Sequence, residues 1–151
     1  MEESRRILLA VRVGDASTGP ARTARWLAQG LGASVTVVYV ATELRTAPEV
    51  GLAMAVPVED LRERMADEAR ERAERWARQA LGSIPFDVRV EDGQVAERIG
   101  AVAAEIGADL VVAGTEARGA ISGMILGDTT RDILRRSPCP VVVVPPAAEK
   151  D

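Results

Sequence analysis

Histidine and asparagine are absent from this chain of 151 residues, and cysteine occurs once. Without histidine the chain cannot form a serine–histidine or cysteine–histidine nucleophile, a histidine proton shuttle or a histidine-ligated metal site. The single Cys139 cannot form an internal disulfide, which suits a reducing compartment. Because Cys139 lies between two prolines just before an apolar run, we interpret it as a small packed residue rather than a reactive thiol.

Excess positive charge and long apolar runs are also lacking. The formal net charge is −4, whereas a general nucleic-acid-binding protein normally presents a basic face. The apolar runs are of strand length, far below the about 20 residues needed to cross a bilayer. No long apolar segment of the kind found in a signal peptide follows the charged start from Met1 to Arg6. We therefore expect a cytoplasmic protein that binds neither nucleic acid nor a membrane.

The pattern of apolar runs predicts a single α/β domain covering residues 1–151. Apolar residues make up 47% of the chain, enough for a substantial core. Continuous apolar runs are typical of strands covered by helices on both faces, and their alternation with helical patterns indicates a parallel sheet. The predicted strands are 7–13, 35–40, 87–90, 110–113 and Val141–Val144, and the four predicted helices are 20–31, Val58–Leu81, 93–106 and one that begins at 127–130.

Two of the predicted helices have a recognisable apolar side. In helix 20–31, Ala24, Trp26 with Leu27, and Leu31 have helical spacing, so we expect them to face the core. In Val58–Leu81 apolar residues recur every three or four positions, and we interpret the charged residues between them as a solvated face with i,i+4 pairs. The apolar set is Leu61, Met65, Ala69, Ala73, Trp76 and Ala80, and the pairs are Glu68–Arg72, Glu71–Arg75 and Glu74–Arg78.

The segment from Thr42 to Pro57 has the least regular pattern. It is long for a connection inside a domain, where the median is about 4–6 residues, and residues 50–56 form an uncharged apolar run. Two interpretations remain open. The segment is either a flap over a ligand or a surface for a partner protein, since exposed apolar loops normally contact something; or it is a short helical turn that covers the edge of the core.

Glycines stand between strand 110–113 and the helix that follows it. Gly114 comes directly after the strand, and Gly127 comes at the start of the helix. Glycine lets a backbone approach a phosphate closely, and a helix N-terminus supplies free N–H groups and the positive end of its dipole. This spacing is consistent with a phosphate-binding loop, and equally with a plain turn of the chain.

The whole chain resembles the universal stress protein family. The resemblance rests on the run from Arg6 to Val11, on the stretch from Val90 to Val112, and on the ending from Ser137 to Val144. It implies a Rossmann-like open sheet of strand order 3-2-1-4-5, with a ligand crevice between the first and fourth strands. It also implies a homodimer formed through the edge strand Val141–Val144, because unpaired strand edges invite pairing.

The resemblance further implies an adenine nucleotide site, for ATP or AMP with Mg²⁺. Val40 matches the position that packs on adenine, and Arg12 stands where nucleotide-binding members have an aspartate, for which Asp15 is an alternative. The family's phosphate motif is glycine, two residues, glycine, nine residues, then glycine followed by serine or threonine. The candidate site residues are Ala10, Val11, Arg12, Val40, Ala113, Gly114, Ala117, Gly127, Asp128, Thr129 and Thr130.

Two of the four motif positions depart from that pattern. Ala117 replaces the second glycine, so its Cβ occupies space next to a phosphate, and Gly119 would replace it only with a different spacing. Asp128 replaces the serine or threonine, and we interpret it as a helix cap. A bridging Mg²⁺ would make Asp128 favourable to a phosphate. Arg12 and Arg118 would either supply positive charge to an anion or pair with Glu116, Asp15 or Asp128.

Three classes of function therefore remain. The interpretation we favour is a regulatory or interaction protein whose nucleotide motif has degenerated. The alternative is an ATP- or AMP-binding protein that uses a modified phosphate loop. A nucleotide hydrolase is the third class, but the adjacent carboxylates Glu91 and Asp92 point to opposite faces of a strand and do not form an acid–base pair.

Overall fold

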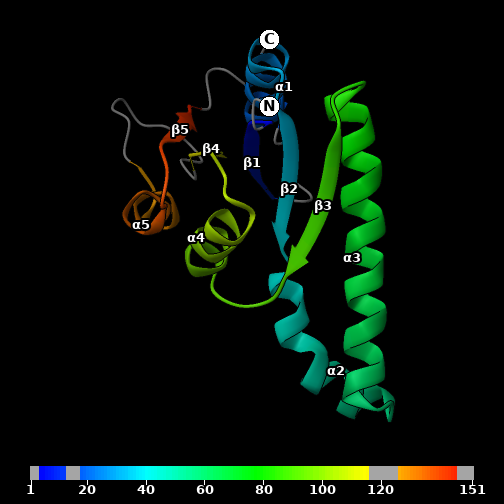
Figure 1. The fold of residues 1–151 in the computed structure, drawn as a ribbon. Helices are drawn as coiled ribbons and strands as arrows, with labels where there is room; N and C mark the ends of the chain where they lie inside the picture. Colours follow the sequence, from blue (N-terminus) through cyan, green and yellow to red (C-terminus); the bar gives the residue numbers. More distant parts are fainter. Residues whose placement is uncertain (1–3, 13–17, 116–125, 146–151) are drawn as a thin grey trace.

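A computed structural model describes residues 4–12, 18–115 and 126–145. Its centre is a five-stranded parallel sheet with strand order β3-β2-β1-β4-β5 (Figure 1). The α/β class, the parallel sheet and the strand order are all as predicted. The strands are β1 Arg6–Val11, β2 Ser34–Val40, β3 Phe86–Glu91, β4 Leu110–Gly114 and β5 Val141–Val144.

The central strands are apolar throughout because helices cover both faces of the sheet. Leu8 pairs with Thr36 of β2 on one side and with Val111 of β4 on the other. Leu8 and Leu9 point to opposite faces, yet both are fully buried. The core is therefore two apolar layers, one on each side of β1.

Two pairs of helices make these layers. The helices α1 Thr18–Leu31 and α3 Val58–Leu81 pack on the face that holds Leu9. The helices α4 Val95–Ile106 and α5 Asp128–Arg136 pack on the face that holds Leu8, and Figure 1 shows them together on one side of the sheet. None of the described helices is long and apolar enough to span a membrane.

The helices approach the sheet closely through alanines. In α3 the residues Ala69, Ala73 and Ala77 are fully buried, and Leu61 and Met65 lie half-buried at the margin of this stripe. In α1 the buried side is formed mainly by alanines, so the prediction that Trp26 and Leu31 face the core is wrong: their exposed fractions are 69% and 49%. Trp26 lies about half a helical turn from the buried stripe, at about 100° per residue.

The segment from Thr42 to Pro57 is largely helical. It forms a 3₁₀-helix, η1 Thr42–Thr46, followed by α2 Ala47–Met54, which lies beside the start of α3 in Figure 1. Leu44, Ala47 and Gly51 are buried, so the interpretation as a helical turn over the core edge is confirmed for this side. The described residues contain five α-helices rather than the four predicted, since α2 was not recognised as one.

The two ends of α4 are set by the residues that flank it. The helix predicted from residue 93 begins at Val95, because the side chain of Gln94 accepts a hydrogen bond from the N–H of Glu97 at 2.6 Å. It ends at Ile106, and the C-cap residue Gly107 has a left-handed conformation (φ 64°), which favours glycine.

Of the i,i+4 pairs predicted on α3, the structure contains Glu74–Arg78, at 3.8 Å. Arg72 instead reaches Glu43 of η1, at 3.1 Å, so its predicted pairing with Glu68 is wrong. Tertiary contacts thus decide where this arginine binds, since an exposed i,i+4 pair contributes only about 0.3–0.5 kcal/mol.

Candidate functional site

The strand order reverses between β1 and β4, and both strands end at the same edge of the sheet. In an open parallel sheet, ligands bind at the carboxyl ends of the strands at such a reversal. The register pairs Leu9 of β1 with Val112 of β4, so Val11 and Gly114 end the two strands side by side. The structure therefore brings the candidate residues of these two strands together. Asp15, Ala117 and Arg118 lie outside the described residues.

Three of the candidate residues share one face of the sheet at this edge. Val40 and Ala113 belong to the apolar layer beneath α4 and α5, with exposed fractions of 7% and 2%, and Ala10 packs against the same layer. Val11 points to the opposite face and packs in the layer beneath α1 and α3. Ala10, Val40 and Ala113 thus belong to the same apolar face at this edge, whereas the side chain of Val11 lies on the other face.

Gly114 is the point where three elements meet. Its carbonyl oxygen accepts a hydrogen bond from Thr130 Oγ1 of α5 at 3.2 Å. A Cβ added to Gly114 would lie 3.2 Å from Cγ of Pro20, in the first turn of α1. A side chain at this position would therefore be crowded against α1, and the φ of Gly114 is not positive.

Thr115 follows Gly114 and was not among the candidate residues. Its N–H donates to the carbonyl oxygen of Val144 at 3.3 Å. Its hydroxyl oxygen is buried and has no hydrogen-bond partner among the described residues. A buried polar group without a hydrogen-bond partner costs about 1–3 kcal/mol. A ligand that formed a hydrogen bond with this hydroxyl would remove that cost. The sequence signal for it is a threonine directly after the strand-ending glycine.

The N-terminus of α5 is not capped by Asp128. The N-cap residue is Gly127, in extended conformation and without a side chain to cap the helix, and Asp128 is the first helical residue. The Asp128 side chain is 99% exposed, and its described partner is Arg131 at 4.0 Å. The interpretation of Asp128 as a cap is therefore wrong, because capping comes from the residue before the helix rather than from its first residue.

The remaining candidate residues surround this helix start. Thr130 is 1% exposed and bound to Gly114, whereas Thr129 is half-buried. Arg12 is exposed at the end of β1 and has an interaction partner of its own. Among the described residues, the edge therefore combines a helix N-terminus with a glycine N-cap, the buried Thr115 hydroxyl and a guanidinium.

Beside Val40, a polar network fixes the chain that leaves β2. The Tyr39 hydroxyl bonds to both carboxylate oxygens of Glu43, at 2.8 and 2.7 Å, and Arg72 of α3 reaches the same carboxylate. Burial, followed by the hydrogen bond to Glu43, raises the pKa of Tyr39 to about 12. Tyr39 is therefore a neutral structural residue rather than a base.

A second group of ion pairs lies at the end of β3. Glu91 pairs with Arg98 and Arg89, and Asp92 pairs with Arg62 of α3. The neighbouring carboxylates thus have separate arginine partners. Among the described residues, no group of three or more acidic or cysteine side chains is placed to hold a metal ion.

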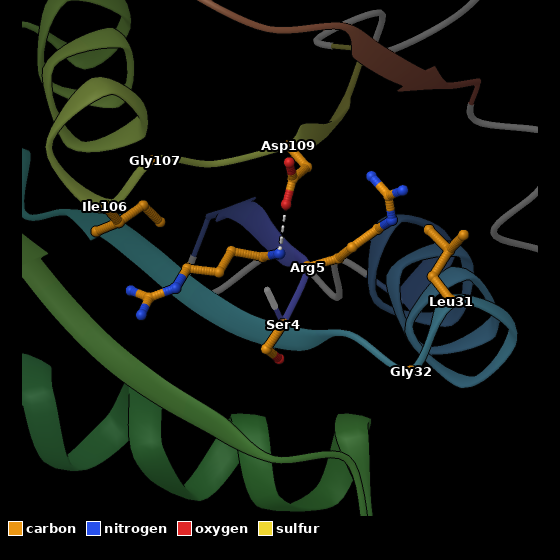
Figure 2. Close-up of a pocket in the computed structure, with 8 residues that line it drawn as sticks. Ser4, Arg5, Leu31, Gly32, Ile106, Gly107 and Asp109 are labelled. Atoms are coloured by element: carbon orange, nitrogen blue, oxygen red, sulfur yellow. Dashed lines mark hydrogen bonds between the residues drawn. The ribbon is translucent and has the colours of Figure 1, made fainter. Parts of the chain in front are cut away.

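The opposite, amino edge of the sheet contains a hollow of about 1060 Å³ (Figure 2). Its walls are the ends of α1 and α4 and the start of β1, where the N–H of Arg6 donates to Asp109 Oδ2 at 2.9 Å. It lies at the amino ends of β1 and β4, whereas ligands of open parallel sheets bind at the carboxyl ends, so the topology does not favour it as the ligand site. Its lining residues are Ser4, Arg5, Arg6, Leu31, Gly32, Ile106, Gly107 and Asp109.

Comparison with known proteins agrees with this architecture. The model of the universal stress protein family matches residues 3–145. A universal stress protein of Thermus aquaticus, named for the QAH/OAS sulfhydrylase 3′ region, is 32% identical over 139 residues, 91% of this chain and 96% of that protein.

Two solved structures share the fold at lower identity. A universal stress protein from Archaeoglobus fulgidus in complex with dAMP has a TM-score of 0.62 and 19% identity, covering 93% of this chain and 97% of its own. A universal stress protein in complex with cAMP has a TM-score of 0.60 and 20% identity, and the match covers 95% of this chain and 98% of that protein. With a family match over nearly its whole length and the sheet order that the family implies, the chain belongs to the universal stress protein family.

Proposed function

We propose that this universal stress protein binds an adenine mononucleotide at the carboxyl edge of β1 and β4, as a regulatory ligand rather than a substrate. The observation that carries the proposal is the open start of α5. Within the described part of the chain, the N-cap residue Gly127 gives the first N–H groups of the helix no side-chain cap, and the Asp128 carboxylate is exposed to solvent. A helix N-terminus of this kind favours an anion through its N–H groups and its dipole.

The neighbouring residues suit the rest of a nucleotide. Ala10, Val40 and Ala113 form an apolar wall on the same face as α5, against which a base would pack. The unsatisfied Thr115 hydroxyl supplies a donor for a ribose or phosphate oxygen. The solved relatives in complex with cAMP and dAMP support adenine as the base and one phosphate as the charge.

Asp128 favours binding of a nucleoside monophosphate over binding of a triphosphate. Its carboxylate is exposed one position into the helix, where it would repel a triphosphate that extends past the helix start. Mg²⁺ between Asp128 and a phosphate would offset that repulsion. AMP is therefore expected to bind without metal, whereas ATP binding is expected to require Mg²⁺.

The second candidate is a regulatory protein that works without a nucleotide. It is favoured by Arg12 and Asp128, which stand where nucleotide-binding family members carry an aspartate and a serine or threonine. Under this alternative the homodimer is the functional unit. β5 lies at the edge of the sheet with three half-buried valines, Val141 to Val143, and a second copy of β5 would pair with it.

Thermal unfolding and calorimetric titration with AMP, cAMP and ATP, each with and without Mg²⁺, test the proposal. A ligand at 100 times its Kd stabilises by about 2.7 kcal/mol, which raises the Tm by several degrees for a domain of this size. Guanosine monophosphate serves as the matched control for the base. A protein that none of these nucleotides stabilises would support the nucleotide-free candidate instead.

A further inference from the structure

The helix α2 is apolar at every position except Glu49. Only two of its residues, Ala47 and Gly51, are buried. Leu52 and Met54 are 84% and 64% exposed. A helix that is hydrophobic all round is normally buried, and grouped exposed apolar side chains mark a surface that contacts something. Among the described residues, half of the large exposed apolar side chains belong to α2: these are Val50, Leu52 and Met54.

Four carboxylates around α2 have no partner among the described residues: Glu49, Glu59, Asp60 and Glu63. Residues 42–64 together with Glu91 and Asp92 contain seven acidic residues and three arginines. Glu43 and Glu91 are compensated by Arg72, Arg89 and Arg98, so the region together with these arginines has a net charge of −1, which lies on the four carboxylates without a partner. We call residues 42–64 with Glu91 and Asp92 the acidic surface. The acidic residues are Glu43, Glu49, Glu59, Asp60, Glu63, Glu91 and Asp92, and the arginines are Arg45, Arg62 and Arg64.

A hollow of about 360 Å³ lies within the acidic surface, between α3, η1 and the end of β3. Leu44, Ala66 and Val90 give it an apolar lining. Arg62 lines it as well and pairs with Asp92. Glu59 and Glu63 line it one helical turn apart on α3, and within the described part of the chain neither has a hydrogen-bond or ion-pair partner. Like charges at this spacing repel each other, so a cation placed between them is favoured.

The acidic surface is held in place before any partner arrives. Arg45 donates to the carbonyl oxygen of Gly93 at 3.0 Å, which fixes η1 to the loop after β3. Gly51 packs against the start of α3, where an added Cβ would lie 3.3 Å from Cγ2 of Val58. Because these contacts are already formed, binding would cost little ordering of the protein.

We propose that the acidic surface binds a basic amphipathic helix of a partner protein. The apolar side of that helix covers the exposed side chains of α2, and its lysine or arginine side chains bind Glu59 and Glu63. Charge complementarity favours this partner, because the carboxylates without a partner beside the apolar helix attract a basic helix and repel an acidic one. The proposal does not depend on nucleotide binding, since no residue of the acidic surface belongs to the candidate nucleotide site.

The test measures binding of a fluorescent synthetic helix built from leucine and lysine in an amphipathic pattern, by anisotropy at physiological salt. A peptide of the same composition in scrambled order is the control for non-specific charge attraction. We expect the amphipathic peptide to bind the full chain and the scrambled peptide to bind at least about tenfold more weakly, a difference of about 1.4 kcal/mol.

Matched variants locate the contact. Leu52→Gln/Met54→Gln and Glu59→Gln/Glu63→Gln should each weaken binding about tenfold or more, and both should fold normally because all four side chains are exposed. Asp67→Asn/Glu71→Gln makes the same charge change with the same spacing on exposed positions farther along α3, and should leave binding unchanged. Unfolding midpoints of all variants confirm their folding.

Three results would overturn the proposal. The first is no binding of the amphipathic peptide by the wild-type protein. The second is equal weakening by the Asp67→Asn/Glu71→Gln control, which would mean general attraction to an acidic protein. The third is a self-association, seen by sedimentation, that Leu52→Gln/Met54→Gln abolishes, since the surface would then bind a second copy of the chain.

Discussion

Thr130 Oγ1 donates a hydrogen bond to the carbonyl oxygen of Gly114 at 3.2 Å, and this bond joins the first turn of α5 to the last residue of β4. Thr130 is 1% exposed, so no solvent would replace the bond. The helix start that we propose as the phosphate site is therefore held in position against the strand that ends beside it.

Replacing Thr130 by valine keeps the shape of the side chain and removes this donor. We expect Thr130→Val to lower the free energy of unfolding by about 0.5–1.5 kcal/mol, the usual contribution of one hydrogen bond. It should also weaken AMP binding, because α5 is no longer tied to β4. Urea unfolding and calorimetry measure the two effects. Thr130→Ser retains the donor and should restore most of the nucleotide affinity; a serine variant as weak as the valine variant would argue against the role of the bond.

Two glycines of the same chain should respond to alanine in opposite directions. A Cβ at Gly114 would lie 3.2 Å from Pro20 Cγ, so Gly114→Ala should be destabilising, by about 1 kcal/mol for mild overpacking. Gly30 lies in α1 with no atom within 4 Å of an added Cβ, so Gly30→Ala should stabilise by about 0.8–1 kcal/mol through helix propensity. Denaturant midpoints of the two variants check the opposite signs, and destabilisation by both would contradict the packing at these positions.

Tyr39 is the single tyrosine of the chain, so its ionisation can be followed directly by ultraviolet absorbance. Burial and the carboxylate of Glu43 raise its pKa to about 12 from the ordinary 10.0. Because the folded-state pKa is the higher one, the associated stability is complete below pH 10 and is lost as the pH rises from 10 toward 12. The absorbance titration of the native protein should therefore be shifted upward, and Glu43→Gln should shift it back toward 10. A native titration already centred at 10 would mean that the Tyr39–Glu43 bond is absent.

The edge strand β5 offers a test of the proposed homodimer. Val143 is half-buried and belongs to neither of the two core layers, although its neighbour Val142 packs against one of them. A charged residue on an edge strand discourages pairing, so we expect Val143→Lys to give a monomer in sedimentation analysis without loss of folding. Leu31→Lys, a similar change at an exposed apolar residue at the end of α1, is the control and should leave the dimer intact. A wild-type protein that is monomeric at high concentration would refute the proposed dimer.

The apolar strands and long helices could be predicted from sequence because their signals are redundant. Leu8 and Leu9 stand in a run that is apolar on both faces, and such a run fits only a covered strand. The strand order came from the resemblance to a family rather than from the runs themselves. Trp26 was placed on the wrong side of α1 because alanines form the buried stripe, and a periodicity search gives a large side chain more weight than a small one.

Other features depend on contacts between distant residues and leave little trace in the sequence. Apolar and polar residues do not recur with a helical period in the sequence of α2, so periodicity could not reveal this helix. The role of Asp128 depends on whether the helix starts at residue 127 or 128, and helix boundaries are the least certain part of a sequence prediction. The bond between Gly114 and Thr130 joins positions sixteen apart, which only the folded chain brings together.

Substitution of Asp128 provides the sharpest test of the nucleotide site, because the result differs between an aspartate that caps the helix and one whose charge repels a phosphate. A capping aspartate stabilises the protein, whereas the Asp128 side chain is 99% exposed with one ion-pair contact at 4.0 Å. We therefore expect Asp128→Ser to change the unfolding midpoint little and to increase affinity for AMP, by up to about fivefold, given the screening of exposed charges. For ATP the same change should remove the requirement for Mg²⁺. Asp132→Ser, which breaks the 3.8 Å contact with Arg135 on the same helix, is the matched control and should alter neither affinity. If Asp128→Ser lowered nucleotide affinity instead, the carboxylate would be a ligand-binding group, and the phosphate would have to bind elsewhere on this edge.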